Sequence, residues 1–253
     1  MIEISVMLNM LKYKEDLSMA ERVVLDYLIE NKAVLKDFKI DFILANAKVE
    51  IPENKEYADV ILAKDSHCGL SAIENNIRVL EDTLKLYDEK ILIEAADVIM
   101  HARKILIFGK GSSYLVCKDL EMKLRRINKF CIAQGESHEQ LVDASFINQK
   151  DVIIFISNSG KTKEIISAAL VAKENKAKII SITKLGASML AELSDIVLYT
   201  SSLEGEFRSA AMTSRISQFC MVDALFAHCA YTDIDRSVRT LETTYKTFQK
   251  YKR

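Results

Sequence analysis

Two hydroxyl-rich segments in the second half of the chain contain the residues best suited to bind a ligand. The first segment is GKGSS at 109–113, and the second is SNSGKTKE at 157–164. Glycine lets the backbone approach a ligand closely, while hydroxyls and free backbone N–H groups at a helix start donate hydrogen bonds to an anion. Both segments follow an apolar run and precede a helical pattern, so together, on neighbouring strands of one sheet, they predict a phosphate site.

Other phosphate-bearing ligands fit the spacing of these segments less well. A dinucleotide-binding turn has a third glycine and an acidic residue about 20 positions further on, and the segment at 109–113 has neither. The segment at 157–164 offers a compact group of donors sized for one phosphate, without the lysine and triphosphate geometry of a P-loop. A simpler explanation stays open, because either segment alone could be a helix N-terminus with additional serines.

Alternating strands and helices must position both loops. Apolar runs predict strands at 104–108, 130–133, 151–157, 178–183 and 196–199, and periodicity predicts helices at 113–128, 162–175, 188–193 and 212–231. Short continuous apolar runs are typical of strands buried on both faces of a parallel sheet, and their alternation with helices predicts right-handed crossovers. The fold class is therefore α/β, a doubly wound parallel five-stranded sheet whose ligands bind at the carboxyl ends of the strands.

Four motifs in order resemble the sugar isomerase (SIS) domain in the form carried by the RpiR/MurR family of bacterial transcription regulators. They are GKGSS at 109–113, GESHEQ at 135–140, SNSGKTKE at 157–164 and EFRSAAMTSRISQFCMVDALF at 206–226. The resemblance covers nearly all of residues 70–231. It implies a flavodoxin-like fold, a phosphosugar effector and a homodimer or homotetramer.

The resemblance also implies roles for individual residues. The residues expected to bind the effector phosphate are the hydroxyl residues of the two loops, Ser112, Ser113, Ser157, Ser159 and Thr162. Glu136 and His138 occupy positions near the sugar, and Glu206 and Arg208 lie in a segment that approaches the site from the same or a neighbouring subunit. Simpler explanations stay open here too: His138 as a partly exposed loop histidine, and Glu206 and Arg208 as partners of each other near a subunit contact.

The first 65 residues are expected to form a small, incomplete helical domain followed by a linker. Ser18 and Glu21 form a capping box before an apolar helical stripe, residues 37–47 are also helical, and residues 50–65 contain the only proline. LSMAERVVLDYLIENKAVL resembles the first helix of the family's helix-turn-helix domain. The segment at 34–42 then resembles a part beyond the recognition helix, so the residues that would enter the major groove have no counterpart.

The distribution of charge agrees with that loss. Residues 1–90 contain 12 lysines and arginines against 18 aspartates and glutamates, whereas a DNA-binding module gathers positive charge. Beyond residue 90, residues 212–231 form a helix so apolar that part of it should face a partner subunit. Residues 232–253 form a basic amphipathic helix, which is either a solvated face with an apolar stripe or a nucleic-acid contact.

Composition limits the classes of protein to which the chain can belong. The chain has 49% apolar and 28% charged residues, as expected of a folded domain, and it has neither a secretion signal nor an apolar run long enough to span a bilayer. We therefore expect a cytoplasmic protein without membrane contact. The five cysteines and four histidines lack metal-ligand spacing, so we expect buried reduced thiols, no metal and no cofactor.

Three functions follow from these observations. The first is an RpiR-family transcription regulator that senses a phosphorylated sugar through its SIS domain and has doubtful contact with operator DNA, and it is not an enzyme. The second is a phosphosugar isomerase with Glu136, His138 or Glu206 as its base. The third is a binding-only adaptor that forms mixed oligomers with a full-length regulator.

Overall fold

The computed structural model describes residues 68–203 and 211–252, which form an α/β unit. Its elements in chain order are α5 (Cys68–Lys85), α6 (Glu89–His101), β1 (Ile105–Gly109), α7 (Ser112–Arg126), β2 (Cys131–Gln134), α8 (Ser137–Ser145), β3 (Val152–Ile156), α9 (Lys163–Glu174), β4 (Lys178–Lys184), α10 (Met189–Leu193), β5 (Ile196–Thr200), α11 (Met212–Thr232) and α12 (Ile234–Tyr251). The five strands pair in parallel in the order β2-β1-β3-β4-β5. This order confirms the predicted flavodoxin-like sheet.

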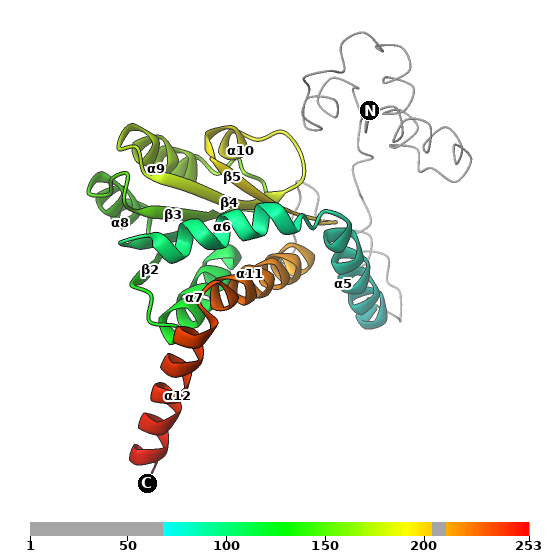
Figure 1. Ribbon diagram of the computed structural model, residues 1–253. Helices are drawn as coiled ribbons and strands as arrows, with labels where there is room; N and C mark the ends of the chain where they lie inside the picture. The colour runs from blue at the N-terminus through cyan, green and yellow to red at the C-terminus, as the bar shows by residue number, and fades with distance from the viewer. Residues whose placement is uncertain (1–67, 204–210, 253) are drawn as a thin grey trace, which may run out of the picture. The chain divides into compact units, whose positions relative to one another are not determined.

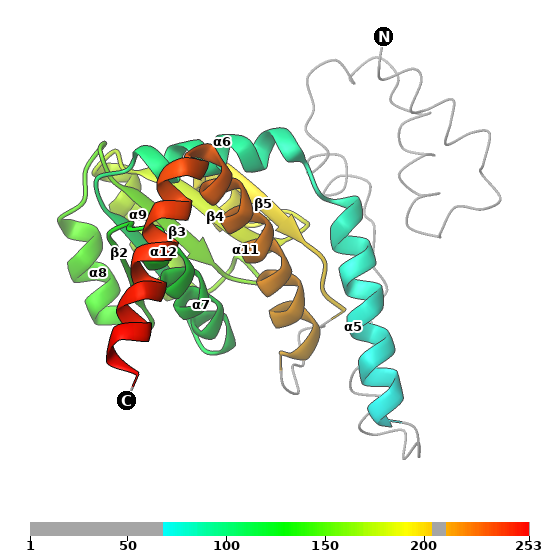
Figure 2. The same cartoon turned by 60° about the horizontal axis from the view of Figure 1, so that its bottom comes forward.

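Helices cover both faces of the sheet, as Figures 1 and 2 show. One core cluster joins the sheet to α6, α7 and α11, and a second joins it to α8, α9 and α10. Strands β1 and β3 are buried along their whole length because every side chain of ILIF and VIIFI packs on one of these two layers. Phe108 and Phe155 meet edge to face in the second layer, with ring centroids 5.8 Å apart.

Apolar residues recur at helical spacing from residue 71 to 101, and this stretch forms two helices. Helix α5 ends at Lys85, and α6 begins after Asp88, whose carboxylate accepts hydrogen bonds from the backbone N–H groups of Lys90 and Ile91. This is an N-cap of the ordinary kind. Both helices pack on α11. The break between them lets the two halves of this stretch contact different parts of the domain.

The predicted helices at 212–231 and 232–253 are confirmed as α11 and α12. Asp233 separates them and caps α12 through its side chain. Beyond the first turns of α12 the side chains are mostly exposed, including the apolar residues Val238, Tyr245 and Phe248. Within the described ranges no helix is long and apolar enough to cross a bilayer.

The expectation of buried cysteines holds for three residues and fails for one. Cys117, Cys131 and Cys229 are buried, whereas Cys220 is exposed. Residue 220 lies on the outward side of α11, because the inward side of that helix is formed by neighbours such as Ser217 and Met221. The predicted helices and linker of residues 18–65 lie outside the described residues.

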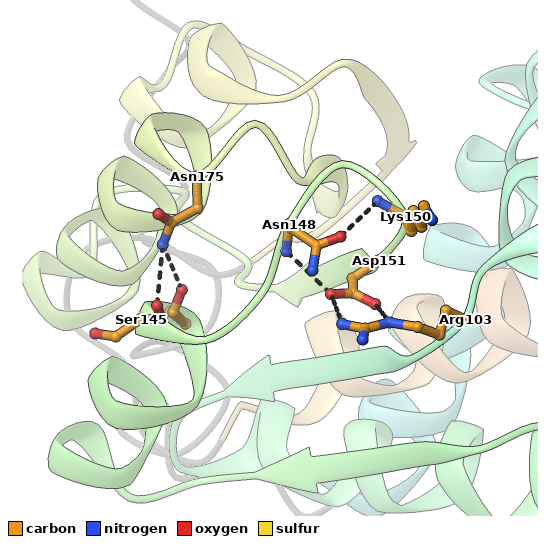
Figure 3. A network of polar contacts seen from close by, with 7 residues as sticks. Arg103, Ser145, Asn148, Lys150, Asp151 and Asn175 are labelled. Atoms are coloured by element: carbon orange, nitrogen blue, oxygen red, sulfur yellow. Dashed lines mark hydrogen bonds and ion pairs between the residues drawn. The ribbon is translucent and has the colours of Figure 1, made fainter.

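Polar contacts stabilise the end of the sheet at which the strands begin, opposite the predicted loops (Figure 3). The Arg103 guanidinium donates to both carboxylate oxygens of Asp151, at 2.9 and 2.7 Å. Asp151 also accepts from the backbone N–H of Asn148 at 3.0 Å, and its own N–H donates to the Asn148 carbonyl at 2.8 Å. These bonds join the end of α6 to the start of β3 and thereby fix the level at which the strands begin.

Candidate functional site

The two predicted loops leave neighbouring strands at the point where the direction of winding reverses. Gly109 at the end of β1 is the register partner of Ile156 at the end of β3. From β1 the chain crosses outward to β2, and from β3 it crosses the other way to β4, so α7 and α9 start on opposite faces. In open α/β sheets this reversal point is where ligands bind.

Two glycines shape the first loop. A Cβ atom on Gly109 would lie 2.7 Å from Cys117 Sγ and 3.1 Å from the Ser113 carbonyl, so only glycine lets α7 pack this closely on β1. Gly111 has φ of 56° and precedes α7, which has no side-chain N-cap. The hydroxyl of Ser112 has no hydrogen-bond partner in the described part of the chain, whereas the buried hydroxyl of Ser113 donates to Gln218 Oε1 at 3.2 Å.

The second loop gathers three hydroxyls at the start of α9. Ser157 is buried, and its Oγ lies 3.5 Å from Oγ1 of Thr162, the N-cap residue, which makes no capping bond with its side chain. The exposed Ser159 accepts from the backbone N–H of Lys161 at 3.2 Å and keeps its own proton. Because the first N–H groups of a helix have no intrahelical acceptor, α9 and these hydroxyls together present donors to an anion.

Strand β4 and the start of α10 hold this second loop in place. The carbonyl of Asn158 accepts from the N–H of Lys184 at 3.0 Å and from the hydroxyl of Thr183 at 3.3 Å. Gly160 has φ of 60°, and a Cβ there would lie 2.6 Å from Cβ of Ser188. The loop is therefore packed against β4 and the start of α10, and it is preorganised for binding.

The segment at 135–140 is a loop only at its start, because α8 begins at Ser137. Glu136 is the exposed N-cap residue and His138 lies exposed in the first helical turn, so the loop interpretation of His138 is wrong in its local structure. The Lys110 ammonium donates to the Ser137 hydroxyl at 2.6 Å, which connects the loop after β1 to the start of α8. Glu136 and His138 thus belong to an element that borders the first loop.

Three residues of the site escaped the sequence interpretation. Gln140 is fully buried, and its Nε2 donates to the carbonyls of Gly109 and Gln134 at 3.2 and 2.8 Å, which joins the ends of β1 and β2. Gln218 contacts Ser113, and Lys110 contacts α8. Two of these residues left a signal in the sequence. Gln218 is an amide inside the very apolar run of α11, and Gln140 stands three positions after Ser137.

Most of the predicted residues therefore lie together at the carboxyl ends of the strands. Ser112 and Ser113 lie at the start of α7, and Ser157, Ser159 and Thr162 lie in the adjacent loop before α9. Glu206 and Arg208 lie outside the described residues. Beneath the first loop, burial raises the pKa of the Cys117 thiol, so that group adds no negative charge there.

Comparison with known proteins identifies the domain type. Residues 98–228 match the family model of the SIS domain. Over 169 residues the chain is 40% identical to an uncharacterized HTH-type transcriptional regulator of Caldanaerobacter subterraneus, a match that covers 67% of this chain and 60% of that protein. The chain thus spans less than two thirds of this relative's length.

Two solved structures resemble the fold. The Vibrio vulnificus NanR protein complexed with ManNAc-6P superposes with a TM-score of 0.70 at 26% identity, covering 95% of this chain and 97% of that one. The sugar isomerase domain of an RpiR transcription factor from Sphaerobacter thermophilus has a TM-score of 0.63 at 20% identity, covering 72% and 99%. At 20% identity, the similarity to the Sphaerobacter protein shows a shared fold.

Proposed function

Because this chain belongs to the SIS-domain family and is 40% identical to an HTH-type transcriptional regulator, we propose that it is a regulator of the RpiR type whose α/β domain senses a phosphorylated sugar. The observation that carries the proposal is the pair of helix starts on adjacent strands, α7 and α9, which lack side-chain caps and are lined by hydroxyls. Such helix starts bind anions through backbone N–H groups and the helix dipole. The complex of NanR with ManNAc-6P supports a phosphosugar as the effector class.

The residues of the proposed site have distinct roles. Ser157, Ser159 and Thr162 hold the phosphate with the N–H groups of α9, and Ser112 and Ser113 complete its environment from the neighbouring strand. Glu136 and His138, which border the first loop, contact the sugar, as do Glu206 and Arg208. Residues 70–231 form the sensing domain, residues 1–65 the shortened helical domain and its linker, and residues 232–253 a C-terminal helix.

A panel of sugar phosphates, including ManNAc-6P, tests the sensing function through thermal stabilisation of the full chain. A ligand at 100 times its dissociation constant adds about 2.7 kcal/mol to the free energy of unfolding. We expect Ser157→Ala and Ser159→Ala to abolish a selective shift. The matched control is Ser167→Ala, because that hydroxyl lies further along α9 and bonds only to the Lys163 carbonyl. No shift with any sugar phosphate would contradict the proposal.

In the cytoplasm, the effector would shift the oligomer between two conformational states through its different affinity for each. We propose a homodimer or homotetramer in which direct DNA binding has been lost, because no position matches a residue of a recognition helix. A mobility-shift assay with the upstream DNA of the gene tests this point at low salt. A specific complex would show that DNA recognition survives through another surface.

The alternatives differ in one observable each. An isomerase needs a base beside C1 and C2 of the sugar, and the carboxylate of Glu136 and the imidazole of His138 are both exposed at the border of the site. Turnover of an aldose or ketose phosphate above the buffer rate would establish it in place of a sensor without catalysis. A binding-only adaptor would form mixed oligomers when it is co-expressed with a full-length relative from the same cell.

A further inference from the structure

A buried amide lies directly behind the serine loop that follows β1. Gln218 of α11 is 1% exposed, and its Oε1 accepts the hydrogen bond from the hydroxyl of Ser113, itself 7% exposed. The second amide atom, Nε2, is buried and has no hydrogen-bond partner within residues 68–203 and 211–252. A buried N–H group without an acceptor costs free energy, so a partner or a rearrangement is expected in one state of the protein.

The orientation of this amide determines what Ser113 can offer to a ligand. A serine hydroxyl has one proton, and here that proton points toward Gln218 Oε1. Ser113 then presents only oxygen lone pairs toward the start of α7. A phosphate dianion consists of acceptor oxygens, so in this arrangement Ser113 repels the group that the loop otherwise attracts.

A half-turn of the Gln218 amide removes the conflict. The two ends of the amide have nearly the same shape, so the turn places Nε2 where Oε1 lies now. Nε2 then donates to Ser113 Oγ, and the hydroxyl proton becomes free to point at the anion.

We propose that Gln218 is a positioning residue whose amide turns when a phosphate group binds at the start of α7, and which thereby reports occupancy of the site to α11. This inference rests on the proposed function, because it requires a phosphate at Ser113. Helix α11 packs on α5, α6 and α7, and its inward side near Gln218 carries the buried hydroxyls of Thr213, Ser214 and Ser217. A change in donor and acceptor pattern at Gln218 therefore acts on the helix with the widest contacts in the domain.

Two substitutions separate the donor role of Gln218 from its bulk. Gln218→Glu places an oxygen that only accepts next to Ser113 and so holds the hydroxyl proton away from the anion. Gln218→Met keeps most of the volume and leaves the proton free. With inorganic phosphate as the probe and ³¹P NMR titration of the full chain, we expect Gln218→Glu to weaken binding by roughly tenfold to a hundredfold, and Gln218→Met by less than about threefold.

A double-mutant cycle with Ser113→Ala distinguishes the hydrogen bond from the added negative charge. If Gln218→Glu acts by holding the Ser113 proton, its effect falls below about threefold in the Ser113→Ala background. If the charge acts directly on the phosphate, the full loss persists in that background and the inference is wrong. Thermal unfolding without phosphate shows whether each variant is folded.

A spectroscopic readout covers the case in which Gln218→Glu does not fold. The side-chain ¹⁵N resonance of Gln218 should shift when wild-type protein is saturated with inorganic phosphate, and it should not shift in Ser113→Ala. An unchanged resonance on binding overturns the inference alone, as do equal affinities of wild type, Gln218→Glu and Gln218→Met. No phosphate binding by wild type overturns both the inference and the proposed function.

Discussion

Arg103 and Asp151 are joined by two nearly parallel hydrogen bonds at the edge of the sheet opposite the serine loops (Figure 3). The side chain of Asp151 is fully buried, whereas that of Arg103 is partly exposed. Although burial alone would raise the pKa of Asp151, the bonds from Arg103 and from the Asn148 N–H hold that pKa below its ordinary value. The ionised carboxylate is therefore the form that stabilises the fold.

We expect Asp151→Asn to lower the free energy of unfolding by about 2 kcal/mol at neutral pH, because charge-assisted bonds are replaced by weaker ones. Since the folded pKa is depressed, the contribution is fully present above the unfolded value of about 3.9 and disappears as pH falls through the folded pKa. Urea unfolding at neutral and acidic pH measures both effects. Asp97→Asn is the control, because Asp97 is an exposed partner of His101. A difference from wild type that persists unchanged at the acidic end would contradict the assignment.

Gly160→Ala should damage the second loop more than Gly111→Ala damages the first. Both residues have positive φ, but a Cβ on Gly160 would collide with Ser188, whereas nothing lies within 4 Å of a Cβ on Gly111. Backbone strain alone costs about 1–2 kcal/mol, and the collision adds to it. Thermal unfolding of both variants tests the order. Equal losses would mean that the contact with Ser188 relaxes without cost.

Glu121 is predicted to protect the edge strand β2. Its carboxylate accepts from the backbone N–H of Ala133 at 3.1 Å and pairs with Lys118. Glu121→Ala leaves a backbone donor of an edge strand unpaired, so we expect a loss of about 2 kcal/mol and faster association of the protein. Light scattering and urea unfolding measure the two effects. Glu121→Gln retains an acceptor and should lose less than half as much, and an equal loss would argue against this role.

Cys220 should be the most reactive described cysteine. Burial raises the pKa of Cys131 to about 11 and of Cys229 to about 12, and both thiols are buried. Partial burial and Asp223 raise the pKa of Cys220 as well, but Cys220 is exposed to the reagent. In a Cys68→Ser background, iodoacetamide should modify Cys220 in the folded protein and the other thiols only after unfolding. Mass spectrometry of peptides identifies the modified residue. Slower modification at high protein concentration would support the prediction that α11 faces a partner subunit, and rapid modification of Cys229 would contradict its burial.

The sheet could be predicted from sequence because β1 and β3 are continuous apolar runs, and such runs between helical patterns admit few other arrangements. Helix α8 was missed because only Gln140 and Ala144 of its residues are buried, which leaves almost no apolar periodicity. The bond between Ser113 and Gln218 joins residues 105 positions apart in the chain. No local pattern encodes such a contact, so the sequence located the serines and not the amide behind them.

The separation between the two edges of the sheet has a consequence for how such domains diversify. The bonds between Arg103 and Asp151 hold the strands together at their amino ends. The candidate ligand contacts come from loops at the carboxyl ends of the strands. If the proposed sensing function is right, substitutions near Glu136 and His138 would alter which sugar is preferred while leaving the contacts of Arg103 and Asp151 intact. The backbone N–H groups at the helix starts, which no substitution other than proline removes, would continue to donate to the phosphate. A domain of this design would therefore exchange one sugar for another through intermediates that all remain folded.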